Sequence, residues 1–195
     1  ATFRAFSYPQ YFLFHFLSYE QFNDGNMIQW IKKLLGLTRP ERITKELIER
    51  LPGAKLCRKF IDGELASNME IEIFDDIMCA VELHAEVFNG GFNQYYYNSG
   101  GERAERAGNM FAELGANRIA DVVKRADGYY TDCRDELCSV WDGTIKGFSD
   151  SYKKFSFDAF DSEYYALVKN EKQLYTLIGT YIKQYPQKFL TGGTE

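Results

Sequence analysis

The sequence predicts an all-α protein, a single compact bundle of about seven to nine helices joined by short glycine-rich turns. Three observations favour this class. The chain has 195 residues, 45% of them hydrophobic, which is enough to bury one core. Only 4 prolines occur, so long helices can run uninterrupted. Hydrophobic residues recur at spacings of three and four, and several such segments end at glycines.

Two helices are predicted near the N-terminus. Residues 1–26 are rich in aromatic side chains and fit neither a helical nor a strand period. Residues 27–36 have amphipathic spacing and end at a glycine, which predicts a short helix. After Pro40, residues 41–51 have similar spacing and are closed by Pro52-Gly53, which predicts a second helix.

The clearest predicted helix covers residues 68–88. Ser67 or Asn68 can cap its N-terminus, and Asn89-Gly90-Gly91 ends it. At 100° per residue, one face is apolar and the opposite face is acidic. The apolar face, with His84 as a core histidine, comprises Ile73, Phe74, Ile77, Val81, His84, Ala85 and Phe88. The acidic face comprises Glu72, Asp75, Asp76, Glu82 and Glu86.

Glycines mark most boundaries in the second half of the chain. Gly100-Gly101, Gly115 and Gly128 each stand where a helical pattern stops. Pro186 ends the last segment, which has a potential break near Asn170. The predicted helices are 92–99, 102–114, 116–127, 131–146 and 161–185.

Charge is distributed unevenly along the chain. Residues 1–60 carry ten basic and five acidic side chains, whereas the nine charged residues between Lys59 and Arg103 are all acidic. Solvated helices usually alternate signs, because oppositely charged pairs stabilise them. One interpretation is a solvated face with accidental bias. The other is a negative stripe that receives a basic partner, whose carboxylates we expect to project into water without neighbouring cations from other parts of the molecule. The candidate partner-binding acidic row is Asp62, Glu64, Glu72, Asp75, Asp76, Glu82 and Glu86.

The residues predict no catalytic group, metal site or cofactor. Two histidines and four cysteines are present, and no phosphate loop, dinucleotide fingerprint, C-x2-C pair or nucleophile elbow occurs. We expect reduced thiols in a cytoplasmic protein. The overall charge of −5 disfavours direct binding of nucleic acid. The segment Trp30-Ile31-Lys32-Lys33-Leu34 is too short for firm membrane attachment.

The segment from Glu86 to Gly101 joins a helix end, a tight turn and a short aromatic helix. Glu86 is followed by Asn89-Gly90-Gly91-Phe92, then Gln94-Tyr95 and Asn98. By composition this is a structural corner, in which the glycines permit unusual backbone angles and the polar groups bond across the turn. The set resembles the E-x-x-N-G-G-F-x-Q-Y-x-x-N motif of the bacterial DNA-mimic-protein family, a domain of unknown function.

The resemblance implies an all-helical fold for residues 60–190, with residues 1–59 as an N-terminal helical and aromatic appendage and residues 191–195 as a loose tail. It further implies a non-enzymatic protein that occupies the DNA-binding surface of a basic transcription regulator and forms a homodimer. The basic N-terminal segment and the modest net charge of −5 depart from the strong acidity typical of DNA mimics.

Two other functions stay open at this point. The first is an immunity or antitoxin-type protein that neutralises a toxin through the same acidic surface. The second is an enzyme that uses Glu86, Asn89, Gln94 and Tyr95 as a polar pocket, which would require an open cleft and a raised carboxyl pKa.

Overall fold

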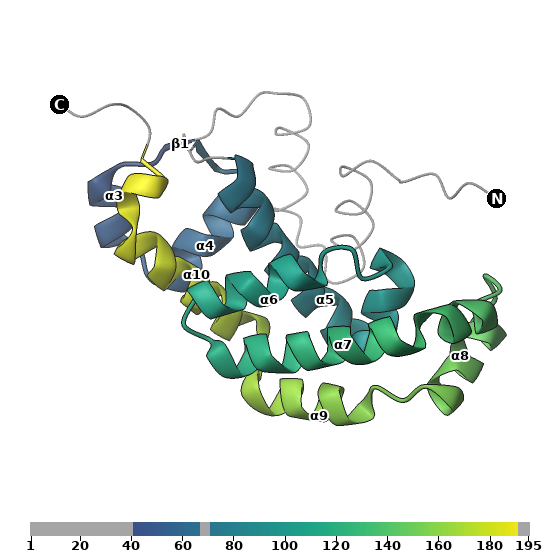
Figure 1. The fold of residues 1–195 in the computed structure, drawn as a ribbon. Coiled ribbons are helices and arrows are strands. Elements are labelled where there is room, and N and C mark those ends of the chain that lie inside the picture. The colour runs from purple at the N-terminus through teal and green to yellow at the C-terminus, as the bar shows by residue number, and fades with distance from the viewer. Residues whose placement is uncertain (1–40, 67–70, 191–195) are drawn as a thin grey trace. The chain divides into compact units, whose positions relative to one another are not determined.

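The computed structural model describes residues 41–66 and 71–190, and the side chains of residues 41–65 and 72–190. By its internal contacts the chain divides into Ala1–Arg39 and Pro40–Glu195, and the described residues lie in the second unit. Among them are eight α-helices, which confirms the all-α class (Figure 1). The strands β1 (Glu41–Arg42) and β2 (Leu65–Ala66) form one short parallel pair, with Glu41 opposite Leu65. The predicted helix over 27–36 lies outside the described residues.

Two short helices follow β1. Helix α3 (Lys45–Arg50) begins where the Thr44 hydroxyl accepts a hydrogen bond from the Leu47 N–H at 3.1 Å. It lies within the predicted 41–51 segment. Helix α4 (Gly53–Ile61) was not predicted, because Pro52-Gly53 resembles a helix stop. Proline is equally suited to a helix start, where its missing N–H costs no hydrogen bond.

Helix α4 packs closely against α10 (Glu171–Gln184), as Figure 1 shows. The two backbones approach at Gly53 and Gly179, where a Cβ on Gly179 would lie 2.0 Å from the Gly53 carbonyl oxygen. Only glycine fits at Gly179 without moving a backbone. Residues 53–61 therefore share a core with α10. The boundary between the N-terminal appendage (1–59) and the helical domain (60–190) stays a prediction.

Helix α5 (Ile71–Ser99) covers residues 71–88 of the predicted 68–88 helix and the whole predicted 92–99 helix, with a kink between them at Gly90 and Gly91. Residues 68–70, with the predicted cap at Ser67 or Asn68, lie outside the described residues. Ile77 and His84 are buried as predicted, but Phe74 and Phe88 are exposed. The buried face is rotated towards Ala80, Leu83, Val87 and Glu86. The prediction that Glu86 faces solvent is wrong, because the side-chain amides of Gln94 and Asn98, beyond the kink, bond to its carboxylate and the residue is buried.

The next two helices test the boundaries predicted at Gly115 and Gly128: the first is confirmed and the second is wrong. Helix α6 (Ala104–Glu113) ends before Gly115, which has a φ of 75° as expected for a helix stop. Helix α7 (Asn117–Val140) instead runs through Gly128, so the predicted break between 116–127 and 131–146 is wrong. Flanking α7 residues such as Val123 and Tyr130 are buried, and this packing outweighs the low helix propensity of one glycine.

The chain turns before α8 (Ile145–Lys154), where the Thr144 hydroxyl accepts from the Gly147 N–H at 3.0 Å. The predicted helix over 131–146 therefore extends past its true end at Val140. Helix α9 (Asp158–Leu167) and α10 are separated near Asn170, which confirms the potential break, and Asn170 caps α10. Helix α10 ends at Gln184, just before Pro186 as predicted, and a 3-10 turn, η1 (Pro186–Lys188), begins at that proline.

The core of the described residues is rich in stacked aromatic side chains. Tyr96 of α5 stacks on Tyr130 of α7, with ring centroids 4.1 Å apart and planes within 6°. All four cysteines are free; Cys57 and Cys79 are buried, and burial raises the pKa of the Cys79 thiol to about 12. None of the described helices has the length and apolar character needed to cross a membrane.

Candidate functional site: the corner and acidic row of α5

The kink in α5 is built on Gly90 and Gly91. Gly91 has φ 73° and ψ −179°, a conformation that favours glycine, and a Cβ there would lie 2.4 Å from Asp161 Oδ2. The backbone N–H of Phe92 donates to Asp161 Oδ1 at 2.7 Å, so a carboxylate from α9 caps the helix segment after the kink. The sequence placed Gly90, Gly91 and Phe92 correctly at a corner but gave no sign of Asp161.

Two tyrosines hold the carbonyl groups that the kink frees. The Tyr152 hydroxyl of α8 donates to the Gly90 carbonyl oxygen, and the Tyr165 hydroxyl of α9 donates to the Val87 carbonyl oxygen at 2.5 Å. Without these donors, the broken helical ladder would leave buried carbonyls unpaired. The corner is thus closed by side chains that lie 60 or more residues further along the chain.

Glu86 joins the two segments of α5 across the kink. Its Oε2 accepts hydrogen bonds from Gln94 Nε2 and from Asn98 Nδ2, both at 2.8 Å, and the residue is only 6% exposed. Gln94 and Asn98 are four residues apart, so they stand on one face of the second segment. Two charge-assisted bonds to one carboxylate make a firm link between the segments.

The other motif residues complete the corner. Phe92 and Tyr95 are fully buried, and only Asn89 and Asn98 are exposed among the motif positions. A carboxylate already occupied by two amides, next to closely packed glycines, does not form the open polar cleft that the enzyme hypothesis requires. The geometry favours a structural role for Glu86, Asn89, Gly90, Gly91, Phe92, Gln94, Tyr95 and Asn98.

The acidic row is neutralised over much of its length. Asp62 lies 3.8 Å from Arg58 and Glu64 lies 2.7 Å from Lys59. Asp75 and Glu82 pair with Arg103, and Asp75 and Asp76 pair with Arg106. The expectation that this row projects without neighbouring cations is wrong, because α6 runs back along the first part of α5 and brings Arg103 and Arg106 against it. Glu72 is the exposed member with no ion pair among the described residues.

Local burial changes the ionisation of several groups around α5. Desolvation raises the pKa of Glu82 to about 7, with the neighbouring Glu86 and Asp75 carboxylates adding to the rise, while the Arg103 guanidinium opposes it. Burial raises the pKa of Asp161 to about 6 and lowers that of His84 to about 4. His84 Nδ1 lies 3.2 Å from the Tyr164 hydroxyl, so it is the satisfied core histidine that the sequence predicted.

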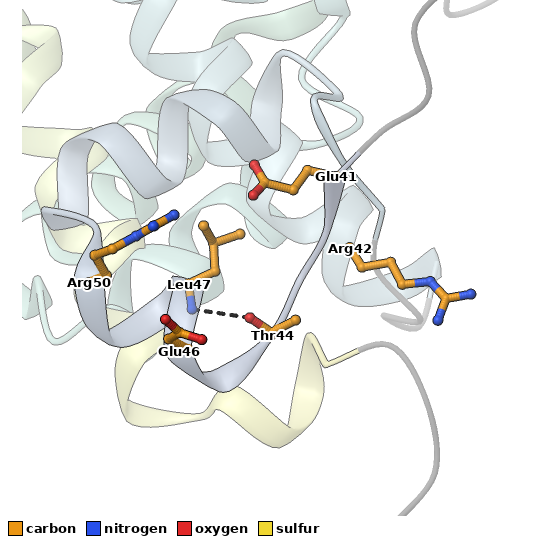
Figure 2. A pocket seen from close by; sticks show the side chains of 6 residues that line it. All are labelled: Glu41, Arg42, Thr44, Glu46, Leu47 and Arg50. Atoms are coloured by element: carbon orange, nitrogen blue, oxygen red, sulfur yellow. Dashed lines mark hydrogen bonds between the residues drawn. The ribbon is translucent and has the colours of Figure 1, made fainter.

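A separate small pocket lies beside β1 and α3. It has a volume of about 270 Å³ and is lined by Glu41, Arg42, Thr44, Glu46, Leu47 and Arg50. Figure 2 shows Arg42 pointing away from the other side chains, and the five polar lining residues are all exposed. Without a buried polar group, this pocket defines no ligand. Among the described residues, no three His, Cys, Asp or Glu side chains are arranged to hold a metal ion.

These features define an all-helical protein with a cross-linked glycine corner and an acidic row that its own arginines partly neutralise. The chain belongs to the DMP19-like protein family, whose model matches residues 72–185. The matched region begins with the acidic part of α5, contains the whole corner and ends at the last residue before Pro186. Searches of curated proteins and of solved structures found no match.

Proposed function

We propose that this protein acts by binding a basic DNA-binding protein in the place that DNA would occupy. The observation that carries the proposal is the match to the DMP19-like family, because membership of this generally non-enzymatic family suggests a DNA-mimic role. We infer accordingly that the chain binds a protein and catalyses no reaction.

The charge of the matched region supports this function. Residues 72–185 contain 19 acidic and 12 basic side chains, a net charge of −7, which is more negative than the whole chain. Exposed carboxylates without an ion pair among the described residues include Glu72, Glu102, Glu105, Asp132 and Asp135. A negative field of this kind speeds association with a basic surface and weakens with salt.

We further propose that the contact includes the acidic row Asp62, Glu64, Glu72, Asp75, Asp76, Glu82 and Glu86. Four basic residues, Arg58, Lys59, Arg103 and Arg106, pair with its members, so the row keeps a net negative charge. Glu86 contributes only through the corner, since it is buried. Glu72 is exposed and has no ion pair among the described residues. The side chains of Asp76, Glu82 and Glu64 are 36%, 38% and 52% exposed, so a partner reaches these members as well.

The full chain, immobilised and incubated with lysate of its host at low salt, should retain a DNA-binding protein that duplex DNA and moderate salt release. A double variant, Glu72→Gln with Asp76→Asn, should weaken this binding about tenfold at low salt. The matched control is Glu46→Gln with Glu49→Gln, which removes two exposed α3 carboxylates and should leave binding nearly unchanged.

Equal loss in both variants would show that only net charge matters. Retention of a partner that DNA does not release, such as a toxin, would contradict DNA mimicry. Light scattering of the same preparation tests the homodimer that the family resemblance implies.

A further inference from the structure

The Arg106 side chain is held by three acceptors within little more than one turn of α5. Its Nε donates to Asp76 Oδ1 at 2.7 Å, and Nη2 lies 2.6 Å from the same oxygen. Nη1 donates to Asp75 Oδ2, and Nη2 also lies 3.4 Å from the Glu72 carbonyl oxygen. One planar guanidinium therefore contacts two carboxylates and one backbone carbonyl.

This arrangement fits a guanidinium better than an ammonium. The five N–H groups of arginine lie in one plane and point in fixed directions, so they meet several oxygens at once. A lysine ammonium is a compact point charge that gains nothing from acceptors spread along an edge. Asp75, Asp76 and the Glu72 carbonyl are spread in this way, along the side of Arg106 that faces α5.

The Arg106 guanidinium that contacts these acceptors is accessible to solvent. The Arg106 side chain is 41% exposed, whereas the neighbouring Arg103 side chain is 20% exposed and also contacts the Asp75 carbonyl and Glu82. An ion pair at such a half-exposed position is weak, because water screens the two charges. Exchange of Arg106 for another guanidinium is therefore inexpensive, and Arg103 still holds Asp75 when Arg106 leaves.

We propose that Asp75, Asp76 and the Glu72 carbonyl form a guanidinium site, which Arg106 fills in the free protein and which an arginine of a basic partner enters in its place. The partner half of this inference rests on the proposed function. The site explains how a row neutralised within the molecule can still receive a basic protein: one cation replaces another, so no carboxylate is left unpaired in the complex.

Chemical rescue tests the site without any partner. Arg106→Ala removes two methylenes and the guanidinium, which N-ethylguanidinium restores in shape and charge. At about 200 mM, N-ethylguanidinium should raise the Tm of this variant by about 1 °C, while ethylammonium at the same ionic strength should not.

The matched control for rescue is Arg125→Ala. Arg125 is 45% exposed and bridges Asp121 and Glu163, which lie on two different helices, α7 and α9. Its variant should show no selective rescue. Equal effects of N-ethylguanidinium on the two variants, or equal effects of the two cations on Arg106→Ala, would overturn the site. If Arg106→Ala does not fold, Arg106→Lys replaces it: a Tm equal to wild type would contradict the need for a guanidinium.

Peptide binding then tests the exchange. Arg106→Ala should bind a fluorescein-labelled nona-arginine peptide at least about 3-fold more tightly than Arg125→Ala does, although both lose one positive charge. A nona-lysine peptide should not distinguish the two variants. Equal nona-arginine affinities would overturn the exchange. Successful rescue together with failure to capture any DNA-binding protein would instead keep the site and reject the proposed function.

Discussion

Gln94 donates its side-chain amide to Glu86 across the kink of α5, at 2.8 Å. The two residues belong to helix segments that point in different directions, so this bond fixes the angle between them together with the Asn98 bond to the same oxygen. Three residues of the family motif, Glu86, Gln94 and Asn98, therefore set the angle between the two segments of α5. The acidic first segment of α5 owes its direction, relative to the second segment, to a carboxylate that does not itself face a partner.

Replacing Glu86 should destabilise the protein strongly. Glu86→Ala removes an acceptor of two charge-assisted bonds and leaves the Gln94 and Asn98 amides without it, which should lower the free energy of unfolding by about 2–3 kcal/mol. Urea denaturation measures the change. Glu102→Ala, at an exposed position nearby, should cost less than about 0.5 kcal/mol. Similar losses for the two variants would refute the linking role of Glu86.

Gly179 should tolerate no side chain. In Gly179→Ala the new Cβ would lie 2.0 Å from the Gly53 carbonyl oxygen, so α10 and α4 must separate. We expect a loss of about 3 kcal/mol or a failure to fold. Gly108→Ala in α6 is the control, because its nearest neighbour, a Val123 methyl group, would be 3.5 Å away. Thermal unfolding of both variants should show a large drop only for Gly179→Ala.

Replacing Gly128 by alanine should stabilise the protein. It is exposed in the middle of α7, no atom lies within 4 Å of the position that a Cβ would take, and its φ is not positive. Alanine lowers the backbone entropy of the unfolded chain and favours helix, so Gly128→Ala should raise the free energy of unfolding by about 0.5–1 kcal/mol. An unchanged or lower unfolding midpoint in urea would show that the helix is not continuous there.

The capping carboxylate Asp161 should give stability a pH dependence with a definite sign. Burial raises its pKa from 3.8 in the unfolded chain to about 6, so the folded state binds more protons between these values. Stability from this group therefore falls as pH rises from about 4 to 6 and stays level above. Asp161→Asn keeps an oxygen for the Phe92 N–H but does not ionise.

The difference in stability between Asp161→Asn and wild type should thus grow in favour of the variant over pH 4–6. His84, whose lowered pKa acts in the opposite direction, cancels in this comparison because both proteins contain it. Denaturation curves from pH 4 to 8 provide the measurement. A difference that shrinks with rising pH would show that the Asp161 pKa is lowered instead.

Local signals predicted much of the fold correctly. The break near Asn170, the kink at Gly90-Gly91 and the stop at Gly115 all follow from side-chain and backbone preferences within a few residues. The errors arose where a local signal has two meanings. Pro52-Gly53 begins α4 instead of ending a helix, and Gly128 lies inside α7 because burial of its neighbours decides the outcome.

For the candidate site, too, some residues were predicted from the sequence and others were found only in the structure. The motif residues were predicted at a corner, whereas the groups that close it, Asp161, Tyr152 and Tyr165, carried no sequence signal that tied them to Gly90 and Gly91. Arg103 and Arg106 offered a weak signal, since they are three residues apart on one helix face directly after the acidic run. Only the packing of α6 on α5 shows which carboxylates they meet.

The sequence by itself determined the all-helical class, the corner and the excess of acidic residues between Lys59 and Arg103, because each depends on residues that are close in the chain. The tertiary structure alone decided how that acidity is presented. Asp75 and Asp76 meet Arg106 some 30 residues later, and Glu86 turns inward to the corner. Charge is compensated in space, over the few ångströms of an ion pair, and the order of charges along a chain does not specify those distances.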